Sequence, residues 1–208
     1  MGGIFGGGGT VSTADTRIGS LAISQSTYGI AIPVVFGTAR VAGNMIDYID
    51  FTAIPHTTTT RSGGKGGGGV TSSHTTYTYE VAAIFALCEG EVQGVKRVWK
   101  NKEVHGSPAA LRMSVYTGAP DQAPWAWMAG AHPDRAISYP QTCYVASPNL
   151  ELSNSATVPS FNYEVAGRDL TPGKQDAAPI SIIRGILSDA QIGVGFPAKY
   201  LADTAQFE

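Results

Sequence analysis

The feature that most constrains this chain is a long strand pattern over residues 77–88. Aromatic and aliphatic side chains alternate with polar ones in its first half, and its second half is apolar on both faces. The residues expected on one face are Tyr77, Tyr79, Val81, Ala83, Phe85 and Leu87. We expect one end of this strand to reach solvent or a partner while the other end lies in the core. The pattern therefore predicts a fold built around a β-sheet.

A second strand pattern and a glycine cluster precede this strand. Residues 41–51 are rich in β-forming side chains, and four threonines follow at positions 57–60. Residues 63–69 consist of six glycines and Lys65. Polyglycine is costly to order because its backbone loses the most conformational freedom on folding. We therefore expect a long β-hairpin arm, rich in Gly and Thr and inserted over residues 52–76, with a mobile glycine tip.

Further strand patterns follow at short intervals, whereas helix patterns are scarce. Strands are expected at residues 94–99, 111–116, 142–146 and 161–165. One helix is expected to begin near Asp176 as its N-cap, with Pro179 in the first turn, and a second short turn is expected at residues 198–202. The chain is therefore predicted to be mainly β with one or two short helices.

The sequence suggests a simple domain organisation. Residues 6–9 are all glycine, so residues 1–18 are expected to form a flexible, Gly-rich N-terminal arm. Residues 19–208 show neither an internal repeat nor a clear interdomain linker. We expect them to form one β-rich region that carries the hairpin arm.

Composition limits the kinds of partner that this chain recognises. Hydrophobic residues make up 43% of it, and charged residues only 14%, against about 25% in typical soluble domains. Two interpretations stay open: a surface that meets other subunits, or a β-rich domain solvated by Ser, Thr and Asn. The net charge is −2 and the Lys and Arg residues are scattered, which disfavours nucleic-acid recognition.

The sequence also predicts assembly in a cytoplasm without a membrane anchor. No apolar run approaches the ~18 residues that span a bilayer, and the N-terminus lacks the features of a signal peptide. Cys88 and Cys143 lie in strand-like stretches, where a buried thiol is common. Because cytosolic proteins rarely form disulfides, we expect two free thiols, and a disulfide between them stays open.

Motifs for catalysis or cofactor binding are missing, so we predict a non-enzymatic protein without a cofactor. Lys65 lies among glycines as in a phosphate-binding loop, but Gly66 stands where that loop needs Ser or Thr. Asp47 and Asp50 are expected on opposite faces of a strand, so they would not converge on one substrate.

The histidines likewise offer no metal-ligand spacing. They are His56, His74, His105 and His132. We expect His56 and His74 to be solvated, with the alternative that they face each other across the arm in a zinc or pH-sensitive contact.

Trp125 and Trp127 are further candidates for recognition. Two tryptophans at this spacing anchor a subunit interface, fill the core under a loop, or line a sugar-binding face. We favour core or interface over carbohydrate. The residues expected at subunit interfaces are Lys65, Tyr77, Tyr79, Trp125 and Trp127.

Four segments carry a resemblance to a known family. Residues 28–44 end in GTARVAGN, residues 77–94 contain ALCEG, residues 158–165 read VPSFNYEV, and residues 176–197 end in GVGFP. In this order they resemble the N-terminal region of phage tail hub proteins, which are the tail-tip or baseplate hub proteins of long-tailed phages. Gene transfer agents carry relatives of these hubs.

The resemblance implies a small β-barrel-like hub domain in a trimer at the distal end of a phage tail. Its partners would be further copies of itself, the distal tail protein or tail-tube ring, and other tail-tip proteins. Because such hubs are longer, this chain is expected to be the N-terminal part of a longer hub or a shortened hub. The alternatives are a carbohydrate-binding module for host surface sugars, through Trp125 and Trp127, and a cell-wall hydrolase.

Overall fold

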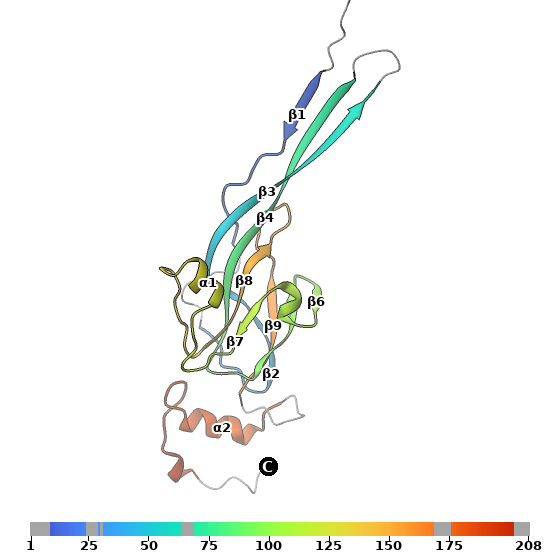
Figure 1. The fold of residues 1–208 in the computed structure, drawn as a ribbon. Coiled ribbons are helices and arrows are strands. Elements are labelled where there is room, and N and C mark those ends of the chain that lie inside the picture. The colour runs from blue at the N-terminus through green and yellow to red at the C-terminus, as the bar shows by residue number, and fades with distance from the viewer. Residues whose placement is uncertain (1–8, 24–28, 30, 64–68, 169–175, 202–208) are drawn as a thin grey trace, which may run out of the picture.

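The computed structural model describes residues 9–23, 29, 31–63, 69–168 and 176–201. The strands form two sheets that share one core, and a long arm extends from this body (Figure 1). The predicted mainly β fold, with a long hairpin arm and short helices, is confirmed. The described strands form two open sheets, however, and do not close into a barrel.

Strand β4 is the centre of the first sheet. It pairs with β3 along one edge, and along its other edge with β1 near the arm tip and β8 in the body. Only the β1–β4 pairing in this sheet is parallel, and β7 extends the sheet beyond β8. The strands are β1 (Thr10–Ala14), β3 (Asn44–Ser62), β4 (Val70–Glu89), β7 (Ser114–Tyr116) and β8 (Thr142–Glu151).

The second sheet lies against the first in the body and has the strand order β2-β9-β5-β6. Its strands are β2 (Thr38–Ala42), β5 (Gly94–Lys100), β6 (Glu103–His105) and β9 (Phe161–Ala166). Gly43 separates β2 from β3, so the chain changes sheets at this residue. A Cβ atom there would lie 2.7 Å from Cε2 of Tyr163 and 3.3 Å from Cβ of Phe85. Glycine thus lets the backbone cross close to the core, and it splits the strand expected at 41–51.

Apolar side chains cover both faces of β4 within the body. On one face, Phe85 of β4 meets Phe161 of β9 edge to face, with 5.4 Å between ring centroids. On the other face, Ile84 and Tyr144 pack with Trp125 in a smaller cluster. Burial on two faces explains why the second half of the β4 pattern is apolar throughout.

Two β-bulges in β3 change the direction in which its acidic side chains point. The pairing with β4 shifts between Met45 and Asp47 and again between Ile49 and Thr52. Asp50 lies in the second bulge with φ of 58°, and the extra residue reverses the alternation of side chains. Asp47 and Asp50 therefore converge on one segment, which corrects the expectation that they lie on opposite faces.

That segment follows α1 (Ala126–Ala131), a short helix that has no clear pattern in the sequence. Nε2 of His132 lies 2.8 Å from Asp50 Oδ2, and Nη2 of Arg135 lies 2.8 Å from Asp47 Oδ1. Both carboxylates thus have cationic or imidazole partners, which fasten the α1 segment to β3.

The remaining helical elements lie close to where the sequence predicts them. The expected helix is α2 (Pro179–Ser188), although Ala178 rather than Asp176 occupies its N-cap position. The expected second turn is the 3₁₀ helix η2 (Ala198–Tyr200). Another 3₁₀ helix, η1 (Pro108–Leu111), precedes β7 and shortens the strand expected at 111–116.

The N-terminal segment contains a strand within the region expected to be flexible. Thr10 of β1 lies opposite Thr71 of β4, and the parallel pairing continues to Ala14 opposite Thr75. The glycines before residue 9 lie outside the described residues. The backbone of β4 offers an open edge at this point, and a strand rich in Ser and Thr fits it without a hydrophobic core.

Candidate functional site

The arm is held by no buried side chain, so packing among the described residues does not explain why it extends from the body. We define the arm as β1, residues 55–62 of β3 and residues 70–77 of β4. None of these residues is buried. At about 3.3 Å per residue, the arm extends roughly 25 Å from the body. A ribbon of this kind has no core of its own, so it is stable only through its hydrogen bonds and through whatever it contacts.

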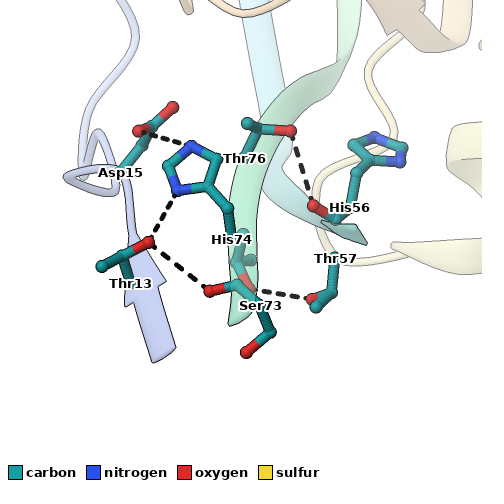
Figure 2. A network of polar contacts seen from close by, with 8 residues as sticks. Thr13, Asp15, His56, Thr57, Ser73, His74 and Thr76 are labelled. Atoms are coloured by element: carbon teal, nitrogen blue, oxygen red, sulfur yellow. Dashed lines mark hydrogen bonds and ion pairs between the residues drawn. The ribbon is translucent and has the colours of Figure 1, made fainter. Parts of the chain in front are cut away.

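Hydroxyl groups link the three strands of the arm (Figure 2). The Oγ atoms of Ser12 and Ser73 lie 2.7 Å apart between β1 and β4, and the Oγ1 atoms of Thr57 and Thr75 lie 2.8 Å apart between β3 and β4. Cross-strand pairs of this type each contribute about 0.2–1 kcal/mol to the stability of a sheet. The Ser and Thr side chains thus stabilise the arm while keeping it nearly free of charge.

The two arm histidines bind different neighbours. Nδ1 of His74 lies 3.0 Å from Thr13 Oγ1, and its Nε2 lies 3.3 Å from Asp15 Oδ1, both in the N-terminal segment. Nε2 of His56 instead lies 2.7 Å from Thr78 Oγ1. The alternative in which the two histidines face each other is therefore not formed. Within the described residues, no group of three His, Cys, Asp or Glu side chains could hold a metal ion.

An open cavity of about 820 Å³ lies at the root of the arm, where β1 has left β4 and β8 has ended. Its walls include the carboxylates of Asp15, Glu80 and Glu151 and the ring of Tyr77. Glu80 and Glu151 are directly opposed in the β4–β8 pairing. Because like charges in that position repel each other, the cavity favours a cationic group over an anionic one.

The sequence-predicted interface residues divide into buried and partly exposed ones. Tyr79 and Trp125 are 2% and 3% exposed, so they stabilise this chain and present almost no surface to a partner. Tyr77 and Trp127 are half-buried at the edges of the two hydrophobic clusters. Lys65 lies outside the described residues.

The burial of Trp125 also bears on carbohydrate recognition. Its ring lies 4.7 Å from that of Trp127, in a tilted pair over the smaller cluster. A sugar-stacking platform needs exposed ring faces, and this pair places one of its two rings in the core. The spacing of the two tryptophans in the sequence is equally compatible with a core, an interface or a sugar-binding face, so it could not predict the burial of Trp125.

A second surface, which is not among the sequence-predicted interface residues, lies on the C-terminal segment. No residue of α2 is buried, and its Ile183 and Ile186 are 54% and 43% exposed. Val194, Phe196 and Tyr200 add further exposed apolar area nearby. The amphipathic pattern predicted the helix but not its exposure, because periodicity alone does not say which surface covers an apolar face.

Comparisons with known proteins identify a fold relative. No protein-family model and no curated protein matches the sequence. Among solved structures, a chain of the virion of a native gene transfer agent particle is similar, with a TM-score of 0.52 and 23% sequence identity. The match covers 90% of this chain and 36% of that one, so this chain spans about a third of its relative's length. The likeness shows a shared fold.

No helix in the described part of the chain is long and apolar enough to cross a membrane.

Proposed function

We propose that this chain is a structural component of a phage-like virion, and that its arm forms a contact between subunits of the particle. The observation that carries the proposal is the arm itself, a three-stranded extension without a single buried side chain. A solitary domain gains nothing from such an extension, whereas an assembly gains an interface. The fold shared with a chain of a gene transfer agent virion supports the same conclusion.

More specifically, we propose a place in the hub at the distal end of a phage tail. The four hub-like segments of the sequence support this placement. The chain would then connect the tail tube or distal tail ring to tip or receptor-binding parts, as a trimer assembled in the host cytoplasm. The role is structural rather than enzymatic.

The exposed edge of β3 indicates how the arm would bind. Among the described strands, β3 pairs only with β4, so its other edge presents backbone N–H and C=O groups to a partner. Arg61 is the only Lys, Arg, Asp or Glu in the described part of β3 beyond residue 55, so little charge opposes the approach of another strand. β-strand addition at this edge would satisfy these backbone groups.

Shortening the arm tests this proposal. In the shortened variant, Asn-Gly replaces residues 57–75, so that a two-residue turn joins His56 to its pairing partner Thr76. A matched control keeps the full arm and replaces only residues 63–69 with a Gly/Ser sequence of equal length. We expect both purified chains to unfold cooperatively, because the arm contributes no buried side chain. We also expect only the control to enter particles, as measured by mass spectrometry of purified virions. Normal incorporation of the shortened chain would contradict the proposal.

A further inference from the structure

Cys88 and Cys143 form a pair that the proposed function does not use. They lie directly opposite each other in the antiparallel β4–β8 ladder, and both are free and fully buried at 0% exposure. A register irregularity between Ala86 and Cys88 creates this arrangement. Because Ala86 lies opposite Tyr144, a regular ladder would place Leu87 opposite Cys143, and the bulge places Cys88 there instead.

The backbone geometry of this pair suits a disulfide bond. Residues that are directly opposite in an antiparallel ladder have Cα atoms about 4.5–5.5 Å apart. Disulfides join cysteines whose Cα atoms lie about 4.4–6.8 Å apart. The Cα separation expected for this pairing thus lies within the range that a disulfide bridges.

The side chains are also in contact. A hydrogen bond between the two thiols lowers the pKa of Cys88, against the opposing effect of burial, and raises the pKa of Cys143, where burial acts in the same direction. Cys88 is thus favoured to ionise first, and Cys143 lies next to its sulfur atom.

We propose that Cys88 and Cys143 form a reversible intramolecular disulfide when the protein meets an oxidant such as glutathione disulfide. The thiolate of one cysteine attacks glutathione disulfide, which releases one glutathione and leaves a mixed disulfide. The second cysteine then displaces the other glutathione and closes the bond between β4 and β8. Two thiols lose two electrons and two protons, and one glutathione disulfide becomes two glutathione molecules.

The bond would link β4 to β8 near the end of their pairing that lies farthest from the arm. β4 runs from the arm into the core, and β8 is its partner only within the body. The bond closes a loop over residues 88–143. Because cross-linking a loop of this size restricts the unfolded chain, we expect the bond to raise the melting temperature by roughly 5–10 °C. Because both thiols are fully buried, oxidation requires that β4 and β8 separate. It is therefore slow in the folded protein and fast during refolding.

The test uses the full chain, unfolded in denaturant and refolded in a glutathione buffer of defined composition. After alkylation under denaturing conditions, we expect a monomer that has lost two hydrogen atoms and carries no alkyl group. Dithiothreitol should restore two alkylation sites and lower the melting temperature. In the C88A/C143A double variant, dithiothreitol should leave the melting temperature unchanged, which isolates the effect of this bond.

Two results would overturn the proposal. One is a folded monomer that still carries two alkylatable cysteines after equilibration with excess glutathione disulfide. The other is an oxidised product that consists of glutathione adducts or intermolecular dimers. Neither result would bear on the role of the arm in a particle, so the two proposals are tested separately.

Discussion

Tyr79 joins the root of the arm to the N-terminal segment. Its ring stacks on Phe51 with 5.5 Å between centroids, and its hydroxyl oxygen accepts a hydrogen bond from the backbone N–H of Ile18 at 2.8 Å. Replacing Tyr79 with Phe keeps the stacked ring but leaves that N–H group without its partner. We expect Y79F to lower the free energy of unfolding by about 1–3 kcal/mol in urea denaturation.

Tyr77 provides the control for this substitution. It lies two positions away on the same strand, beside the open cavity, and its hydroxyl makes no hydrogen bond to the described residues. We expect Y77F to change stability by less than about 0.5 kcal/mol. Equal losses from the two variants would show that the Ile18–Tyr79 hydrogen bond does not stabilise the arm root.

Gly118 is fixed by both its conformation and its surroundings. Its φ is 88°, and a Cβ atom would lie 2.6 Å from the carbonyl oxygen of Gly90 and 3.0 Å from the backbone nitrogen of Cys143. Alanine at this position adds left-handed strain and a clash with rigid backbone. We expect G118A to lower the free energy of unfolding by roughly 2–4 kcal/mol. Gly106 has open space around it, and G106A should change stability by no more than about 0.5 kcal/mol. The measurement is urea denaturation, and a G118A variant with the same denaturation midpoint as the wild type would contradict this prediction.

Glu164 connects stability to pH on the outer face of the second sheet. Hydrogen bonds from Arg97 hold the pKa of Glu164 below its ordinary value of 4.5, with a smaller contribution from the charge of Lys96. Because the folded pKa is the lower one, this contribution to stability is complete above about pH 4.5. It is lost as the pH falls through the folded pKa.

Substitution of the two basic residues separates their effects on this carboxylate. We expect R97Q to raise the pKa of Glu164 toward its ordinary value, and K96Q to raise it less, in an NMR titration of the side-chain carboxyl carbon. The stability difference between wild type and R97Q should shrink as the pH falls below about 4.5. An unchanged pKa of Glu164 in R97Q would contradict this assignment.

At the scale of elements, β3 and β4 each have one half in the packed body and one half in the exposed arm, and we expect the two halves to differ in stability. Within the body, residues 81–88 of β4 are all buried, whereas residues 70–77 include no buried residue. Local opening is easier where few apolar contacts hold the strands together. In the isolated chain, we therefore expect backbone amides of residues 57–62 and 70–75 to exchange with deuterium at least about a hundredfold faster than those of residues 83–86. Equal protection along β4 would indicate that the arm is stable without a partner.

The elements also show what the sequence could and could not predict. The alternation at residues 77–88, the hairpin arm and α2 follow from local patterns, because each has a clear period and is bounded by glycines, threonines or proline. The bulges in β3 and beside Cys88 do not follow, since an extra residue in one strand depends on its partner strand.

Strand β1 and helix α1 were missed for a related reason. β1 consists of Ser, Thr, Val and Ala, all exposed, and it is ordered through its pairing with β4. α1 has only six residues and includes a glycine, so its propensity is weak, and packing of Met128 against the smaller cluster holds it. Interface residues were equally hard to choose: Tyr79 and Trp125 have the side chains of interface anchors but fill the core.

The whole molecule consists of a well-packed body and two elements, the arm and α2, that contribute no buried residue to its core. The arm extends from one end of the body and α2 lies at the other (Figure 1). Both expose backbone or apolar groups that the described residues do not cover. This distribution is the physical basis of the proposal that the chain belongs to an assembly.

The most direct test of the central claim is quantitative mass spectrometry of purified particles from the source that encodes this chain, calibrated against a tail-tube subunit. We expect the chain to be present at low abundance, about three copies per particle, as a cyclic trimer at the tail tip requires. Six or more copies would move the chain to a ring or tube position within the same virion. Absence from intact, infectious particles would contradict the assignment as a virion component.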